Sequence, residues 1–287
     1  LYQPQSGADG LGRLDALRHK ALDLLQREPD ECLFVLFQAL ADPALGYCAS
    51  HALLSAVVCE LTAHKVGMSA RQRTALFRAA LMMNIGMARA QDALATQNAM
   101  PSDAQRNLIR DHPRLGAEML QAMGLEDGDA VDIVRWHHDP DAAPASSDTL
   151  QPCHLLRVAD MFVAKMAARK TRLAMSPLGA ARSMVLNASG VATVLASAVA
   201  TAVGFYPPGT YVQLVNGERA VVVRRGPRAH DAQVVSIVSP GGMPLLQYLH
   251  RDVRESRYAI RAPINAEKIR VLVSFERAYA ALAQGRA

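Results

Sequence analysis

Residues 79–87, Ala-Ala-Leu-Met-Met-Asn-Ile-Gly-Met, are the most informative stretch of this chain. Apolar residues at helical spacing lead into the stretch, among them Leu76, Phe77 and Leu81, after a helix-start signal near Ser69. The pattern predicts a buried helix that runs into the segment. Outward from it, the sequence continues with further helical patterns on both sides and changes character only after Gly204.

Composition supports a mainly helical protein. Of the 287 residues, 51% are hydrophobic, 20% are charged and 5% are aromatic, and many of the apolar residues are Ala, Leu, Val and Met. This balance favours packed helices over a β-sandwich.

The longest weakly polar run, residues 191–205, is too short to span a bilayer. The four cysteines lack C-x-x-C spacing, which predicts reduced thiols in a cytoplasmic protein. The first residue is Leu1, and we expect a longer native chain.

The patterns divide the chain into three parts. Residues 1–46 are expected to form an N-terminal helical segment, residues 47–204 a helical domain, and residues 205–287 a small β appendage with a final helix. Helices are expected over 11–27, 29–36, 47–65, 101–110, 112–124, 129–138, 151–169, 189–203 and 265–283. Two more are expected to start at 69 or 70, running into 79–87, and at 176, and the expected strands cover 210–215, 218–224 and 233–238. Asn216-Gly217 is a strong hairpin signal between the first two strands.

Five residues are candidates for metal chemistry. They are His51, His112, His137, His138 and Asp160, each on or near an expected helix. Metal-assisted phosphate hydrolysis needs neutral imidazoles and carboxylates that converge on one or two cations. The sequence spacing alone leaves open whether these side chains meet. A single His or Asp is more often a hydrogen-bonded structural residue, and that alternative stays open for each of them.

A series of motifs in the right order resembles the HD-GYP-type proteins, a subgroup of the HD-domain metal-dependent phosphohydrolases known for hydrolysing cyclic di-GMP. The matching segments are Tyr47–His51, Ala79–Met87, His112-Pro113-Arg114-Leu115-Gly116, Trp136-His137-His138-Asp139, Val158-Ala159-Asp160-Met161-Phe162, Ser176-Pro177 and the appendage Gly204-Phe205-Tyr206-Pro207-Pro208-Gly209-Thr210 with Asn216-Gly217-Glu218. The resemblance implies an HD-domain helical bundle. It also implies that His51 and Asp160 serve a first metal and that the other three histidines serve a second or adjacent metal.

The chain departs from the family pattern at its signature segment. Met83 and Asn84 stand where the family has its metal-binding His-Asp doublet, and Met87 stands where it has Lys. Thioether sulfur suits soft cations, and a neutral amide is a poorer bridge than a carboxylate. The loop 140–145 also lacks the Arg and the Gly-Tyr-Pro that recognise the cyclic dinucleotide in the family. We therefore expect no cofactor, or one weakly bound divalent ion of Fe, Mn, Zn or Ni.

Basic residues suggest binding of phosphate or polyanions, but less specifically than the motifs above suggest a metal site. Lys165 and Arg169 resemble the family's basic run after the last metal-binding motif and could attract phosphate, although a solvated helix end is an equal alternative. From Phe205 onward, 12 Lys/Arg stand against 6 Asp/Glu within a chain of net charge +5. Such a basic region could meet an acidic partner or nucleic acid, but no nucleic-acid motif accompanies it.

These observations predict a degenerate HD-GYP-like domain without cyclic di-GMP phosphodiesterase activity. It would act as a regulatory or protein-interaction module in bacterial signalling, with a protein partner, doubtful cyclic dinucleotide binding and no membrane span. A homodimer through the helical body is left open. The first alternative is a residual metal-dependent phosphohydrolase that uses the retained histidines. The second is polyanion or nucleic-acid binding through the basic C-terminal part.

Overall fold

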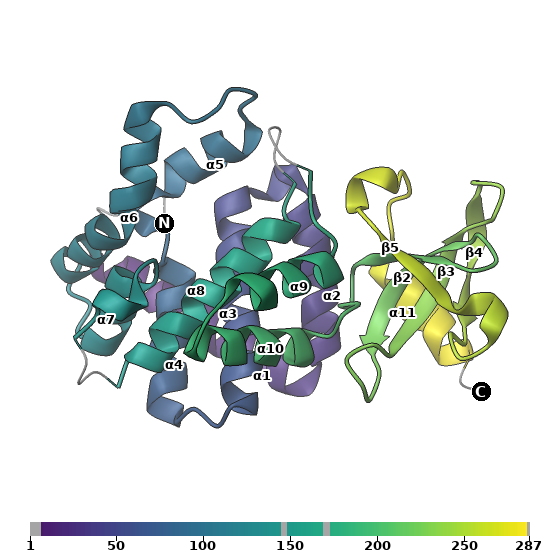
Figure 1. Ribbon diagram of the computed structural model, residues 1–287, viewed down its shortest axis with the longest axis horizontal. Coiled ribbons are helices and arrows are strands. Elements are labelled where there is room, and N and C mark those ends of the chain that lie inside the picture. The colour runs from purple at the N-terminus through teal and green to yellow at the C-terminus, as the bar shows by residue number, and fades with distance from the viewer. Residues whose placement is uncertain (1–6, 145–147, 169–172, 286–287) are drawn as a thin grey trace.

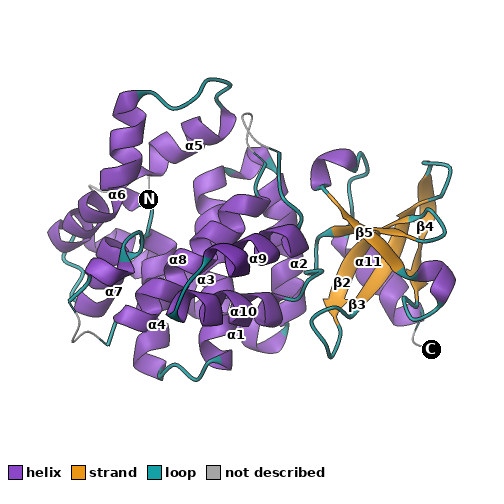
Figure 2. Cartoon of the chain, viewed as in Figure 1, coloured by secondary structure: helices purple, strands orange, loops and turns teal. Residues whose placement is uncertain are grey.

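The computed structural model describes residues 7–144, 148–168 and 173–285 of the chain. A helical body is followed by a smaller unit that consists of one antiparallel sheet and a helix (Figure 1). Figure 2 shows how cleanly the two kinds of secondary structure separate, with the strands confined to the C-terminal unit. The predicted fold class, mainly helical with a small β appendage and a final helix, is therefore confirmed.

The helical body has one continuous core. Its helices are α1 (Gly7–Arg27), α2 (Pro29–Ala41), α3 (Tyr47–Lys65), α4 (Ala70–Met82), α5 (Ala88–Thr96), α6 (Asp103–Ala122), α7 (Gly128–Trp136), α8 (Leu150–Met166), α9 (Pro177–Asn187) and α10 (Val191–Val203). Leu54 of α3, Leu76 of α4, Ile133 of α7, Leu155 of α8 and Leu195 of α10 are all essentially buried in this core. The apolar stripes seen in the sequence thus face one another, as amphipathic helices require.

The signature segment lies at the centre of the body. Helix α4 begins with a capping box formed by Ser69 and Gln72, and the chain passes Asn84 into the 3-10 helix η3 (Ile85–Met87). Gly86 lies directly against α6, since a Cβ there would be 2.5 Å from the His112 carbonyl oxygen and 2.8 Å from the Gly116 amide nitrogen. Only glycine permits such a close backbone approach. This contact fixes the position of the segment relative to His112.

Helix α6 corrects one expectation. We expected a helix over 101–110 and a new helix from His112-Pro113, but α6 continues through Pro113. Proline removes the backbone donor that would pair with the carbonyl four residues earlier. Here His112 supplies the missing donor, with its Nδ1 2.7 Å from the Ile109 carbonyl oxygen. The helix therefore tolerates its internal proline.

The sheet has the order β4-β3-β2-β1-β5, and all its pairs are antiparallel. Its strands are β1 (Tyr211–Leu214), β2 (Arg219–Arg225), β3 (Ala232–Val238), β4 (Pro244–Arg251) and β5 (Ile260–Ile264), and α11 (Phe275–Gln284) packs beside them. The three predicted strands are confirmed. The two edge strands were missed because β4 is largely exposed and β5 contains Pro263, so neither shows the alternation of a half-buried strand. The final helix begins at Phe275 instead of near Asn265.

Helix α2 joins the two units. Leu33 and Phe37 belong to the core of the helical body, whereas Phe34 packs edge-on against Phe275 and Tyr279 of the C-terminal unit. Polar contacts reinforce this junction, including the Arg225–Asp30 ion pair at 2.5 Å. One helix thus contributes to both hydrophobic cores.

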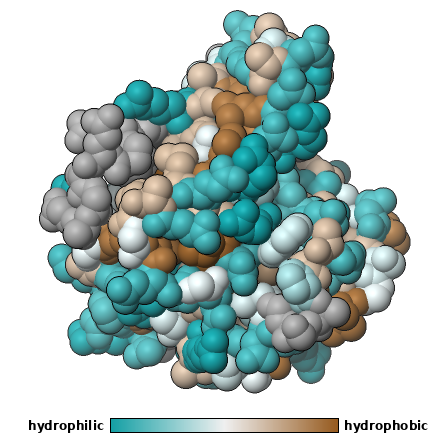
Figure 3. Space-filling view, turned by 90° about the vertical axis from the view of Figure 1, so that its left-hand side faces the viewer, coloured by the Kyte–Doolittle hydropathy of each residue, from teal (hydrophilic) through white to brown (hydrophobic). Residues whose placement is uncertain are grey.

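None of the described helices is both long and apolar enough to cross a membrane. The face drawn in Figure 3 is mostly polar, and its most apolar side chains appear on it as several separate patches. All four cysteines are free, and Cys48, Cys59 and Cys153 are buried.

The junction leads to a testable prediction about Gly209. Gly209 has φ +85°, and a Cβ there would collide with the Phe34 carbonyl of α2. Gly242 has the same φ of +85° but open space around it. We expect Gly242→Ala to lower the free energy of unfolding by about 1–2 kcal/mol through backbone strain alone. Gly209→Ala should lower it by roughly 1–3 kcal/mol more because of the added clash. Urea denaturation of both variants measures this difference, and equal losses would contradict the contact.

Candidate metal centre

His112 and His137 share the same local arrangement. His112 lies in α6 and His137 at the C-terminal end of α7. The His112 Nδ1 is 2.7 Å from the Ile109 carbonyl oxygen, and the His137 Nδ1 is 2.7 Å from the Val134 carbonyl oxygen. A carbonyl oxygen only accepts, so each Nδ1 must carry the proton. Both imidazoles therefore keep their lone pair on Nε2.

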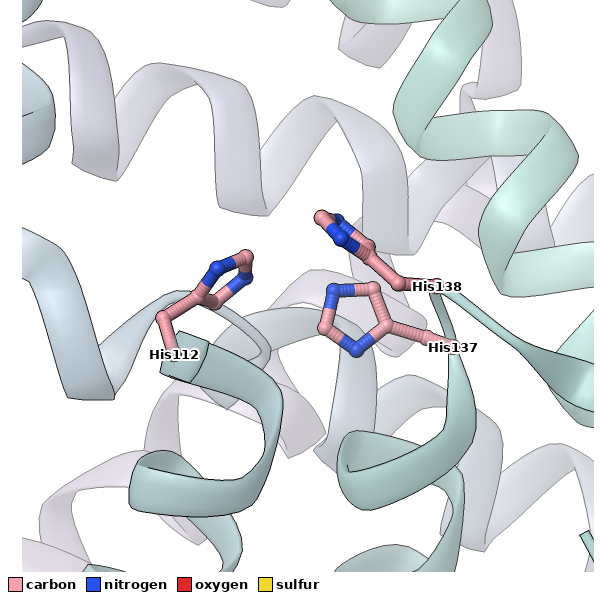
Figure 4. A group of neighbouring side chains, drawn as sticks. All are labelled: His112, His137 and His138. Carbon is pink, nitrogen blue, oxygen red and sulfur yellow. The ribbon is translucent and has the colours of Figure 1, made fainter. Parts of the chain in front are cut away.

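The two Nε2 atoms are buried and have no hydrogen-bond partner in the described part of the chain. His138 completes the group, and Figure 4 shows the three rings turned toward one another from α6 and from the end of α7. The ring centroids are 5.3 Å apart for His112–His137, 4.7 Å for His112–His138 and 4.5 Å for His137–His138. One nitrogen from each residue lies within 4.8 Å of the other two. This arrangement places three imidazole donors around one point.

The electrostatics favour neutral rings. Burial, aided by the nearby charge of His138, lowers the pKa of His112 to about 4. The same two causes lower the pKa of His137 to about 3, and burial also lowers the pKa of His138. Metals bind the neutral form of imidazole. The cluster therefore needs no deprotonation near pH 7.

His51 and Asp160 form a second group beside the cluster. The His51 Nε2 is 2.7 Å from one Asp160 carboxylate oxygen, and its Nδ1 is 3.2 Å from the Tyr47 hydroxyl. The other Asp160 oxygen is 4.0 Å from the His138 Nε2. Burial alone would raise the pKa of Asp160, but the His51 hydrogen bond and the surrounding imidazoles bring it below its usual range. Asp160 is thus a carboxylate that links the two groups, and all five predicted residues meet in space.

Met83 and Asn84, which stand where the family has its His-Asp doublet, differ from the five candidate residues in burial and chemistry. The Met83 side chain is 0% exposed and belongs to the hydrophobic core. Asn84 is 4% exposed, and its Nδ2 has no partner among the described residues. Met87 is half-buried in η3. The three histidines fit one divalent cation with nitrogen preference, such as zinc, nickel or iron. Met83 and Asn84 supply no charged bridge, so the residues do not fit a carboxylate-bridged pair of cations.

The two proposed phosphate-binding residues remain predictions. Lys165 lies in the last turn of α8, half-buried, and Arg169 lies outside the described residues. Sequence reasoning missed Arg157, whose charge also lowers the pKa of His138. It also missed the role of Tyr47 as the partner of His51. Helical spacing could have found both, because Arg157 precedes Asp160 by three residues and Tyr47 precedes His51 by four.

Comparison with known families gives one match. The family model of the HD domain matches residues 48–165, a range that begins in α3, ends in α8 and includes all five candidate residues. The chain therefore resembles the HD domain over residues 48–165, which is less than half of its length. A comparison with curated proteins and one with solved structures found no match.

The buried histidines predict how stability depends on pH. Imidazoles in the unfolded chain titrate near 6.5, whereas His112 and His137 titrate at about 4 and about 3 in the folded protein. Between these values only the unfolded chain gains the protons, so stability falls as the pH falls below 6.5. Each histidine contributes up to about 1.4 kcal/mol per pH unit. We expect the free energy of unfolding of chelator-treated protein to drop by on the order of 2–4 kcal/mol between about pH 7 and pH 5.

Variants separate this effect from other titrations. His137→Gln and His112→Gln should each give a shallower slope of unfolding free energy against pH, measured by urea denaturation. His230→Gln removes a histidine whose side chain is 60% exposed and should leave the slope unchanged. Equal slopes in the wild type and both buried-site variants would contradict the assignment.

Proposed function

We propose that this HD domain is of the HD-GYP type and acts as a non-hydrolytic regulatory or protein-interaction module in bacterial signalling. The observation that carries the proposal is the chemistry of the doublet position. Met83 is wholly buried in the core, and Asn84 offers a neutral amide where a bridging carboxylate would be needed. Both lie in the segment that Gly86 packs against His112, beside the histidine cluster.

Loss of the doublet affects the step that hydrolysis depends on. Two-metal hydrolases hold their cations about 3.5–4 Å apart so that both the attacking and the leaving oxygen are stabilised. Among the five candidate residues only Asp160 is a carboxylate, and it is already hydrogen-bonded to His51. The retained residues supply donors for one cation, which supports binding more than phosphodiester cleavage.

The region after the histidine pair also argues against a cyclic dinucleotide as substrate. His138 is followed by the short 3-10 helix η4 (Pro140–Ala142), and the sequence 139–150 contains no Gly-Tyr-Pro. We therefore propose that the binding partner is a protein and that the interaction takes place in the cytoplasm. Lys165 and Arg169 remain proposed contacts for a phosphate group on that partner or on a nucleotide.

A direct assay tests the missing activity. We expect the wild-type protein to leave cyclic di-GMP intact with Mn²⁺, Fe²⁺ or Ni²⁺, as measured by chromatographic separation of the linear dinucleotide. Met83→His/Asn84→Asp restores the family doublet and should raise any turnover above that of the wild type. Met100→His, at a side chain that is 76% exposed, is the control for an added surface imidazole. Wild-type turnover abolished by His137→Ala would overturn the proposal.

A second candidate is a residual single-metal phosphohydrolase. The specific observation in its favour is the pair of buried, unpartnered Nε2 atoms on His112 and His137 beside His138. When bound, a cation would polarise a phosphate oxygen. The histidines would hold that cation, with His112 and His137 buried and the 39% exposed side chain of His138 on the solvent side.

Metal content tests the histidine site that both candidates share, and a model substrate separates them. We expect elemental analysis of protein purified without chelator to show about one equivalent of divalent metal, lost in His137→Ala/His138→Ala and kept in His230→Ala. For the regulatory module, bis(p-nitrophenyl) phosphate should stay intact in every variant. Hydrolysis by the wild type that His138→Ala abolishes would establish the phosphohydrolase instead.

A further inference from the structure

A cavity lies among α8, the end of α9 and the start of α10. These three helices pack side by side in the helical body (Figure 1). The cavity has a volume of about 310 Å³, at the lower end of the range of roughly 300–1,000 Å³ found for small-molecule sites. None of the five candidate metal residues lines it. It is therefore a feature of the helical body that is separate from the histidine cluster.

Arg157 of α8 is the cavity residue that best indicates which kind of ligand would bind. Its side chain is half-buried and lines the cavity. In the part of the chain that the structure describes, Arg157 has no hydrogen bond and no ion pair. Most arginines of this chain are paired, for example Arg78 with Asp15 and Asp127. A half-buried arginine without a partner favours an anionic ligand, because its guanidinium offers several donors in a fork that matches carboxylate and phosphate oxygens.

His154, one turn before Arg157 on α8, adds a second polar group. It is 8% exposed, and its Nε2 is 3.4 Å from a carboxylate oxygen of Asp141. Asp141 is the one carboxylate that lines the cavity, and its side chain is 80% exposed. The imidazole of His154 thus lies on the buried side of the lining, whereas the one acidic group lies at the solvent side.

The start of α10 supports the same polarity. Val191 and Ala192 of its first turn line the cavity, and the preceding Gly190 gives no side-chain cap. The uncapped amides of a first helical turn carry partial positive charge. This feature alone would not define a site, but it adds to the unpaired guanidinium of Arg157.

The rest of the lining combines the polar residues Asn187 and Ser189 with several apolar side chains. Val158 and Met161 of α8, Met184 of α9, and Ala192 and Ala196 of α10 line the cavity. The apolar character continues onto the surface, where Val191 is 50% exposed and Leu186 and Val194 of the adjoining turns are 77% and 66% exposed. A ligand with both a charged group and a hydrocarbon part would match both kinds of wall.

We propose that this cavity is a binding site for a small organic anion, with its carboxylate or phosphate group at Arg157 and its apolar part against Met161 and Met184. The proposal stands apart from the proposed function, since it uses none of the metal-site residues. The site lies on α8, the helix that also carries Asp160.

Calorimetric titration of the full chain tests the site. The probes are phenyl phosphate and hexanoate, added to chelator-treated protein so that no metal can bind them. We expect one equivalent of at least one probe to bind the wild type, and the tighter probe identifies the preferred anion. Arg157→Gln should weaken binding at least tenfold, since it removes a charge-assisted pair, and Arg157→Lys should retain part of the affinity. Arg261→Gln, at an exposed residue of β5, is the matched control and should bind as the wild type does.

Two further variants test the polarity and the location. Asp141→Asn removes the acidic group at the cavity mouth and should leave binding equal or tighter. Ala192→Phe adds bulk at the half-buried edge of the cavity and should abolish binding while circular dichroism shows an intact helical fold. The proposal is overturned if neither probe binds at millimolar concentration, if Arg157→Gln binds as the wild type does, or if inorganic phosphate binds as tightly as phenyl phosphate.

Discussion

The backbone contact between Gly86 and α6 is the constraint on which the centre of this protein depends. A side chain at position 86 would push the signature segment away from the His112 carbonyl and the Gly116 amide. Gly116 in turn faces Ile85 of η3 and Val134 of α7, so η3, α6 and α7 meet at this point. Because α6 carries His112 and His137 directly follows α7, the close packing of α6 against α7 at Gly116 holds the two buried imidazoles near each other.

The charge balance of the centre follows from that packing. The imidazoles of His112 and His137 are held neutral by burial, and their free nitrogens point into the same space. Asp160 is the one carboxylate among the five candidate residues and is shared between His51 and His138. Two divalent cations would bring four positive charges into a buried site with one compensating charge, which is costly. One cation, or none, is compatible with these residues.

The C-terminal unit is tied to the helical body through α2. Phe34 reaches the sheet-side core while Leu33 belongs to the helical core, and Gly209 lets the appendage lie directly on the α2 backbone. Gln38 of α2 also accepts a hydrogen bond from the Tyr211 hydroxyl of β1. The appendage is therefore packed on α2 of the helical body through specific contacts of both polar and apolar kinds.

The sequence by itself determined the helical class, most helix positions, the Asn216-Gly217 hairpin and the identity of the five candidate residues, because periodicity, caps and turn residues are local signals. Prediction from the sequence was wrong or incomplete where contacts made in the folded chain decide the local structure. Helix α6 runs through Pro113 because His112 replaces the lost donor, and the edge strands β4 and β5 exist because β3 and β1 pair with them.

Only the tertiary structure decided that the three histidines converge, which nitrogens remain free, and that Arg157 has no partner in the described part of the chain. These properties depend on burial and on contacts between helices that are remote in the sequence.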